Sequence, residues 1–328
     1  MNTTLSRIKK RYHLTIFNIK NDCYFSKKLA MFRFISDIGG RIGFKKISGW
    51  AHSNKENYIL NYISEVIDNV IIKYKDCKDL GIKQDNAPIW VCWWDGVDQA
   101  PILVQKCINS IKTNANNHPV YVITKDNYME YLEVPDFIFD KVVNGNMKLA
   151  HFADYLRVCL LEKYGGLWLD ATIYCSEKLP EDYFSIPFFT CKSEIKKGFY
   201  ISDYQWTTFC LGGWKHNIFY KFMKDSFETY WKRCDYAIDY LFFDDLIYLA
   251  KNNIPSINEL MEKVQINNIH RDDLQAAMNK SEDSCNWSSI INEDTCLYKL
   301  SWRESYSEKN SNGEETIYGR FIKKGWGK

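Results

Sequence analysis

The sequence predicts an α/β protein whose mostly parallel sheet is flanked by helices and preceded by a helical extension. Two observations carry this prediction. From Pro88 onward, short runs rich in β-branched and aromatic residues alternate with segments of helical periodicity, an order typical of βαβ units. Before Pro88, apolar residues recur at spacings of three and four between positions 55 and 75, which indicates an amphipathic helix. We therefore expect a helical extension over residues 1–87 and an α/β domain over 88–328.

The expected elements follow one another in a regular order. Strands are predicted in the first half of the domain over residues 89–94, 119–124, 137–143 and 167–174. The helices between them are predicted over residues 100–111, 126–132 and 147–164. Beyond Pro180 the pattern predicts strands at 188–191, 206–211 and 296–302, with helices at 216–233 and 236–251. Such a sheet binds ligands beyond the carboxyl ends of its strands.

Basic residues gather at the start of the chain. Residues 1–50 hold eleven Lys or Arg against two acids, a net charge of +9, while the remaining residues carry −7. A basic arm on an acidic body attracts anionic surfaces. Because no RNA- or DNA-binding motif accompanies the arm, we expect an anionic membrane surface and no nucleic acid as its partner. A merely solvated basic face is the alternative.

The cysteines and the apolar runs bear on the compartment. The eleven cysteines are scattered, odd in number and never spaced as Cys-x-x-Cys, which argues against a disulfide framework and a zinc site. The N-terminus lacks an apolar segment followed by a small-residue cleavage site, and no run approaches the ~18 apolar residues of a spanning helix. We therefore expect a cytoplasmic protein, peripheral on the inner face of the plasma membrane.

Three polar residues interrupt the mostly apolar helix predicted over residues 147–164. His151, Asp154 and Arg157 are spaced i, i+3, i+6 and form a stripe on one side of that helix. A helix packed on a sheet does not normally carry an acid and an arginine inside its apolar stretch, so the stripe indicates a functional site. An exposed Asp154–Arg157 ion pair, worth only ~0.3–0.5 kcal/mol, is the alternative.

An acid follows this helix at the carboxyl end of the next predicted strand. Gly165-Gly166 ends the helix, and the strand 167–169 leads to Asp170. A carboxylate at the mouth of a parallel sheet can hold a divalent cation or bond a ribose hydroxyl. Thr172, two residues on, faces the same way and can bond or ligate weakly. A turn-forming aspartate is the alternative for Asp170.

These two segments together resemble the capsular polysaccharide synthesis proteins, which belong with glycosyltransferase family 32 and its relatives. The chain has His-x-x-Asp-x-x-Arg from His151 and then Tyr-Gly-Gly-Leu-Trp-Leu-Asp-Ala-Thr up to Thr172. The family has a Ser-Asp-x-x-Arg helix followed by Gly-Gly-x-Tyr-x-Asp-x-Asp. The first strand, IWVCWWDG at 89–96, and the late segment 298–302 resemble further family segments. The resemblance covers roughly residues 88–302.

The resemblance implies a GT-A (Rossmann-like) fold and a retaining glycosyltransferase of capsule biosynthesis. Such an enzyme transfers a hexose from a UDP-sugar to a growing capsular or surface polysaccharide, and we expect a lipid-linked oligosaccharide as acceptor. The sequence offers no obvious second carboxylate as a covalent nucleophile, in contrast to retaining hydrolases. The acceptor is therefore expected to attack on the face that the diphosphate leaves, so that catalysis depends on positioning and on stabilising the leaving charge.

The resemblance also assigns the two ends of the domain to the nucleotide. Trp94, which Asp95 follows, would lie against the nucleobase. Ser301 and Trp302, near the other end, would steady the leaving diphosphate. Both pairs are expected in the donor site.

The central motif is assigned to the donor sugar. Asp154 and Arg157 would grip its hydroxyls, and Asp170 would contact the ribose or a metal ion. The residues expected to carry catalysis are Asp170, Arg157 and Trp302.

The chain departs from the family at Thr172, where many relatives carry the second Asp of the metal motif. A divalent cation, Mn²⁺ or Mg²⁺, would then be held by Asp170 and the diphosphate. Asp244 and Asp245, in the predicted helix 236–251, are candidates for a further acid or for the acceptor site. The polar face of a helix is the alternative for these two residues.

The missing second acid also suggests a catalytically inactive protein that binds nucleotide sugars. An inactive relative would more often have lost Arg157 or Trp302 as well, and both are present. The enzyme is therefore the favoured hypothesis. Turnover of a UDP-sugar, even slow hydrolysis, distinguishes the two.

Overall fold

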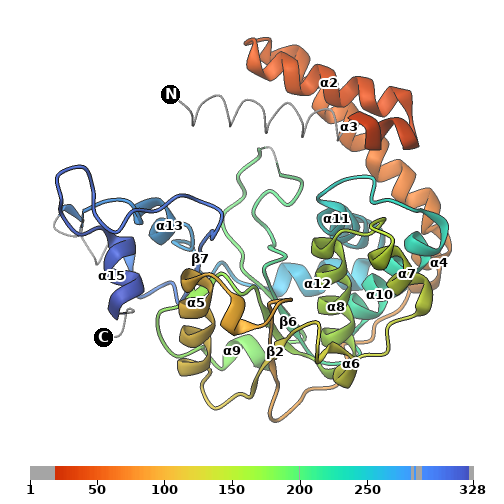
Figure 1. Cartoon of the computed structure of the whole chain (residues 1–328). Coiled ribbons are helices and arrows are strands. Elements are labelled where there is room, and N and C mark those ends of the chain that lie inside the picture. The colour runs from red at the N-terminus through yellow and green to blue at the C-terminus, as the bar shows by residue number, and fades with distance from the viewer. Residues whose placement is uncertain (1–18, 199, 282–283, 286–289, 325–328) are drawn as a thin grey trace.

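A computed structural model describes residues 19–198, 200–281, 284–285 and 290–324. At its centre lies a five-stranded sheet in the order β2-β1-β3-β6-β5 (Figure 1). β1 pairs in parallel with β2 and β3, whereas β6 runs antiparallel to both β3 and β5. The strands are β1 (Ile89–Cys92), β2 (Val120–Ile123), β3 (Gly166–Leu169), β5 (Phe188–Thr190) and β6 (Cys210–Gly213). The predicted mostly parallel sheet is confirmed.

A second, two-stranded sheet brings the late part of the chain to the end of β3. It pairs β4 (Ile173–Cys175) with β7 (Leu297–Lys299) in antiparallel order. In this register Ile173 lies opposite Lys299. The pairing therefore places a side chain from near the C-terminus beside the residues that directly follow β3.

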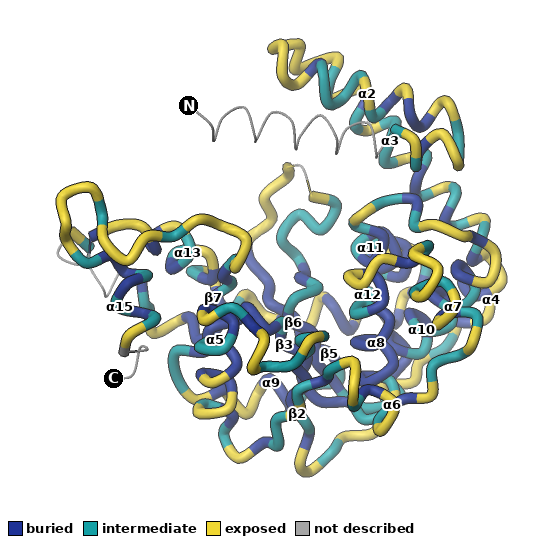
Figure 2. The backbone as a smooth tube through the Cα atoms, in the orientation of Figure 1, coloured by how far each residue is buried: buried dark blue, intermediate teal, exposed yellow. Residues whose placement is uncertain are grey.

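Helices cover both faces of the central sheet. Neighbouring residues of a strand face opposite sides, and they belong to two different hydrophobic cores: Trp90 and Trp168 lie in one, Ile89 and Leu167 in the other. In Figure 2 most of the tube of β1, β3, β5 and β6 is buried, whereas β2, at the edge of the sheet, is only partly buried. Burial on both faces explains why the strands read as continuous apolar runs.

Most of the helices pack into these two cores. The first core contains α8 (Leu149–Tyr164), α10 (Ile218–Arg233), α11 (Phe242–Asn253) and α12 (Pro255–Lys263). The second contains α5 (Ile102–Thr113) and α9 (Asp182–Ser185). The first core also takes residues from α2 (Lys27–Arg41), α3 (Lys45–Val66), α4 (Asp68–Tyr74), α6 (Tyr128–Tyr131) and α7 (Asp136–Val143). A third cluster contains α13 (Asp273–Ala277) and α15 (Ile317–Lys324), and the 3-10 helix η1 (Val97–Gln99) packs on the second core.

The N-terminal extension is a helical hairpin that stands away from the sheet (Figure 1). α2 and α3 pack against each other, and both α3 and α4 contact α10. The predicted helical segment is confirmed in this part, while residues 1–18 of the basic arm lie outside the described residues. The domain boundary at residue 87 stays a prediction. None of the helices that the structure describes is both long and apolar enough to cross a membrane.

The glycine pair after α8 lets β3 enter the sheet. Gly165 ends α8 with a positive φ of 67°, and its N–H donates to the Leu161 carbonyl. Gly166 has a φ of 94°, and a Cβ there would lie 2.0 Å from the Pro88 carbonyl oxygen. Because only glycine permits this approach, Leu167 can donate to the same oxygen at 2.8 Å and start β3 beside β1. The predicted glycine stop is confirmed.

The strand predicted over residues 137–143 is wrong, because this segment is the helix α7. Ile138 and Val142, four residues apart, pack toward the first core, whereas Phe139 and Val143 are exposed. This burial has the period of a helix, not the alternation of a strand. The aromatic and β-branched residues of the segment favoured a strand locally, and packing against the core overrode that preference.

The single strand predicted over residues 167–174 is two strands. The Ile173 N–H donates to the Asp170 carbonyl at 2.9 Å, which closes a turn between β3 and β4. The chain leaves the central sheet at this turn and enters the small one. Asp170 and Thr172 therefore lie in a turn at the carboxyl end of β3.

Candidate functional site

A cavity of about 440 Å³ opens at the carboxyl ends of β1 and β3. It is lined by the end of β1, one face of α8, the turn between β3 and β4, the loop before β6, the residues around the start of α11, and the chain from the end of β7 onward. Its polar lining residues are Asp154, Arg157, Asp170, Thr172, Thr208, Tyr240, Asp244, Lys299, Ser301 and Arg303. The cavity lies where a parallel sheet is expected to bind a ligand.

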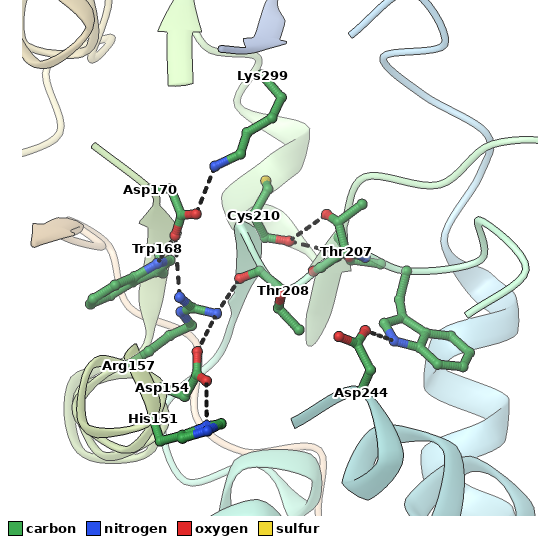
Figure 3. A network of polar contacts seen from close by, with 12 residues as sticks. His151, Asp154, Arg157, Trp168, Asp170, Thr207, Thr208, Cys210, Asp244 and Lys299 are labelled. Atoms are coloured by element: carbon green, nitrogen blue, oxygen red, sulfur yellow. Dashed lines mark hydrogen bonds and ion pairs between the residues drawn. The ribbon is translucent and has the colours of Figure 1, made fainter. Parts of the chain in front are cut away.

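The carboxylate of Asp170 is the centre of the polar network in this cavity (Figure 3). Its Oδ1 accepts hydrogen bonds from Trp168 Nε1 at 3.0 Å and Arg157 Nη2 at 3.2 Å. Its Oδ2 accepts one from Lys299 Nζ at 2.8 Å. Burial alone would raise the pKa of Asp170, but the charges of Lys299 and Arg157 lower it to about 2. Asp170 is therefore ionised at neutral pH and faces two cations.

Arg157 is buried where α8 meets the sheet. Its Nη1 donates to the Thr208 carbonyl at 2.6 Å and lies 3.3 Å from Asp154 Oδ1. Its guanidinium lies over the Trp168 ring, 4.8 Å from the centroid, in a cation–π contact. The side chains of Asp154 and Arg157 are only 17% and 6% exposed, which excludes the alternative of a solvated surface pair.

The acid of the α8 stripe differs from Asp170 in its electrostatics. Burial raises the pKa of Asp154 to about 7, with Arg157 opposing that rise. His151 lies next to it, with Nδ1 at 3.9 Å from Asp154 Oδ2. Burial, together with the charge of Lys148, lowers the pKa of His151 to about 4, so this histidine is neutral at pH 7. Asp154 can accordingly accept or donate a hydrogen bond near neutral pH.

Lys299 is a site residue that the sequence analysis missed. Its Nζ donates to Asp170 Oδ2 and to Thr172 Oγ1, both at 2.8 Å. The signal was a single lysine in the otherwise apolar run Cys296–Leu300, which the pairing of β7 with β4 aims at the motif. The ammonium group of Lys299 thus bridges the side chains of Asp170 and Thr172.

The two acids of α11, Asp244 and Asp245, lie in different surroundings. Asp244 lines the cavity, accepts a hydrogen bond from Trp206 Nε1 at 2.9 Å, and has its pKa raised to about 6 by burial. Asp245 does not line the cavity, and burial raises its pKa well above the usual range. Its Oδ2 is buried and bonds to none of the described residues. Only Asp244 is therefore placed to act in this site.

The aromatic residue at the end of β1 is not the one that the sequence predicts. Trp93 lines the cavity and meets the Trp302 ring edge-on, at 5.7 Å between centroids. Trp94 packs instead on Tyr128 and Phe152, because the Lys125 N–H donates to its carbonyl and ties it to the β2 side. Of the two tryptophans, Trp93 and not the predicted Trp94 therefore lines the cavity.

The remaining predicted nucleotide residues also divide. Asp95 is exposed, lies outside the cavity lining and pairs with Lys125 at 3.3 Å. Ser301 and Trp302 both line the cavity, and 42% of Trp302 is exposed. Ser301 and Trp302 thus line the same cavity as Asp170, whereas Asp95 does not reach it.

The expected divalent cation finds few ligands here. Across the described part of the chain, no group of three or more His, Cys, Asp or Glu side chains is placed to hold a metal ion. Both oxygens of Asp170 already accept hydrogen bonds, and the Thr172 hydroxyl accepts one from Lys299. Mg²⁺ demands near-octahedral oxygen coordination, so this donor set does not fit it.

Comparison with known proteins gives one result. No curated protein and no solved structure matches the chain. The family model described as capsular polysaccharide synthesis protein matches residues 41–321, which include both sheets and every residue that lines the cavity. The chain therefore belongs to the family of capsular polysaccharide synthesis proteins.

Proposed function

We propose that the protein is a retaining glycosyltransferase of GT-A type that transfers a hexose from a UDP-sugar to a growing capsular or surface polysaccharide. A polysaccharide grows by forming glycosidic bonds, so transfer is the reaction that the family's role calls for. The observation that carries the proposal is the ionic network of one cavity: Asp154, Arg157, Asp170 and Lys299. Carboxylates can bond sugar hydroxyls, and fixed cations stabilise a departing diphosphate.

The chemistry that these groups support needs no covalent intermediate. The acceptor hydroxyl attacks the anomeric carbon on the face that the diphosphate leaves. The bond from that carbon to the phosphate oxygen breaks, the new carbon–oxygen bond forms, and the hydroxyl proton passes to the diphosphate. Asp154 orients the sugar hydroxyls, while Arg157 and the residues after β7 face the leaving charge.

The acceptor has room beside the donor. A second cavity of about 420 Å³ shares Tyr240 with the first. It is lined by aromatic and polar residues that include Tyr24, Asn146 and Tyr236, a mixture that suits sugar rings and hydroxyls. We assign the oligosaccharide acceptor, whose lipid-linked form remains part of the proposal, to this side, with Tyr240, which lines both cavities, between the two ligands.

A donor screen tests the enzyme against an inactive binding protein. The wild type is incubated with UDP-glucose, UDP-galactose and their N-acetyl forms, and we expect UDP release from at least one. Asp170→Asn should lower that release by ~100-fold or more, because the neutral amide no longer holds the two cations in place. Asp79→Asn, which alters an exposed Lys–Asp pair outside the cavity, is the matched control.

Two outcomes would contradict parts of this proposal. UDP binding without turnover of any donor would favour the inactive binding protein. Wild-type release by a folded Asp170→Asn protein would remove Asp170 from the site.

A pair of tryptophan variants tests the placement of the nucleobase. We expect Trp93→Ala to weaken UDP binding by about ten- to hundredfold, the usual effect of losing one stacked ring. Trp94→Ala should keep UDP affinity and lower stability by about 2 kcal/mol or more, since it empties a packed site between Tyr128 and Phe152. Calorimetric titration and urea unfolding measure the two effects. The reverse pattern would restore Trp94 as the stacking residue.

The α2–α3 turn supports attachment to an anionic membrane. Residues 41–47 are all exposed, and within them Ile42, Phe44 and Ile47 are 61%, 58% and 52% exposed. Lys45 and Lys46 lie between these apolar side chains. Apolar residues that enter the headgroup region, flanked by lysines that attract anionic lipid, are the features of an interfacial anchor. We propose that this turn holds the enzyme on the cytoplasmic face of the membrane.

Vesicle binding tests this anchor. The intact protein should bind phosphatidylglycerol vesicles at low salt, and added salt should weaken that binding because it screens the lysines. Phe44→Ser with Ile47→Ser should weaken it by about tenfold or more, because apolar area no longer enters the bilayer. Ile72→Ser, at a residue that is 66% exposed on α4, should change nothing. Intact protein that ignores these vesicles at low salt would refute the anchor.

A further inference from the structure

We infer that the ammonium group of Lys299 takes the place of a divalent cation in this site, and that the chain binds the diphosphate of its donor without a metal ion. The inference rests on the proposed function, because it concerns how a nucleoside diphosphate is held in the same cavity. It goes beyond that function in naming Lys299, which no motif singles out, as the cation that faces the leaving group.

The position of Lys299 is set by the backbone. β7 pairs with β4 so that Lys299 lies opposite Ile173, and the Leu300 N–H donates to the Thr172 carbonyl at 2.9 Å. The side chain therefore starts one residue from the motif and reaches back along it. Its Nζ is 2.8 Å from both Asp170 Oδ2 and Thr172 Oγ1. Those two oxygens face one point, and the ammonium fills it.

A metal ion would have to displace this ammonium to use the same two oxygens. The displaced ammonium would remain close to the divalent cation, and the repulsion between the two charges falls only inversely with distance. The second carboxylate oxygen, Asp170 Oδ1, is engaged by Arg157 and Trp168. The next acids in the cavity are also occupied: Asp154 by Arg157 and Asp244 by Trp206. The site thus already holds a cation, and each of these acids has at least one oxygen engaged by a described residue.

The ammonium suits a diphosphate in charge and in hydrogen bonding. A lysine carries three N–H donors, and Asp170 and Thr172 account for two among the described residues, which leaves one for a phosphate oxygen. The side chain is 27% exposed and lines the cavity, so a ligand can reach it. Arg303 adds a further positive charge to the same wall. These cations can carry the leaving charge that a metal would otherwise neutralise.

The same arrangement explains the departure at Thr172. A second carboxylate there would bind the ammonium from both sides and cancel its charge, whereas a neutral hydroxyl positions it and leaves the charge for the ligand. The neutral hydroxyl of Thr172 and the ammonium of Lys299 then act together to present a positive charge to the ligand. The simpler alternative is a Lys299 that only neutralises Asp170, in which case its loss affects stability and not nucleotide affinity.

Titration of UDP with and without metal tests the inference on the wild type alone. We expect the same affinity in EDTA and in Mn²⁺. Binding that appears only with Mn²⁺ would overturn the role of Lys299 while leaving the UDP site intact. UDP that fails to bind in either condition would overturn the proposed function and, with it, this inference.

Substitution tests the side chain directly. Lys299→Met, which keeps the apolar stem, should weaken UDP binding in EDTA by about tenfold or more, the usual loss for one charged hydrogen bond. Lys299→Arg, which keeps the charge, should bind UDP more tightly than Lys299→Met. Lys221→Met, in the exposed pair with Asp79, is the matched control and should bind like the wild type. Wild-type UDP affinity in a folded Lys299→Met protein would reduce Lys299 to a structural partner.

A double variant asks whether lysine and metal are interchangeable. Thr172→Asp combined with Lys299→Met supplies two carboxylates and removes the ammonium. We expect this protein to bind UDP in Mn²⁺ and to lose that binding in EDTA, the reverse of the metal-independent wild type. Equal UDP binding by the double variant in both conditions would contradict the exchange.

Discussion

The carboxylate of Asp170 holds three elements of the fold at one point: it ends β3, binds Arg157 of α8 and binds Lys299 of β7. A carboxylate shielded from water is costly unless opposite charges and hydrogen bonds surround it, and both are supplied here. Two backbone features bring Asp170 and Lys299 together. Gly166 lets β3 lie beside β1, and the β4–β7 pair delivers Lys299.

Under the proposed function, this constraint orients the cations of the cavity for an anionic ligand before one arrives. The cations are already oriented by Asp170, by the Thr208 carbonyl and by Thr172. Fixed charges of this kind stabilise a developing negative charge without reorganising when the reaction occurs. The pKa values of the two acids are shifted in opposite directions: that of Asp170 is lowered to about 2, and that of Asp154 is raised to about 7. One acid serves to hold cations, and the other can exchange hydrogen bonds with hydroxyls.

The sequence was sufficient to predict structure where the residues concerned lie close together in the chain. The helix that carries Asp154 and Arg157, its glycine stop and the acid after the next strand are contiguous, so their spacing predicted the local fold and grouped residues that line one cavity. Residues brought in by pairing between distant segments were invisible to that approach. Lys299 reaches the cavity only through the register of β7 with β4. Trp93 lines the cavity in place of Trp94, whose carbonyl accepts a hydrogen bond from Lys125, just after β2. The helix α7 was mistaken for a strand for the same reason, since its apolar side is defined by a distant core.

The most direct test of this account is a crystal structure of the protein with UDP and Mn²⁺. The account predicts the diphosphate within hydrogen-bonding distance of Lys299 Nζ, with the contact between Lys299 and Asp170 retained and no anomalous manganese signal beside Thr172. A manganese ion coordinated by Asp170, with the lysine turned away and the diphosphate bound to the metal, would contradict it.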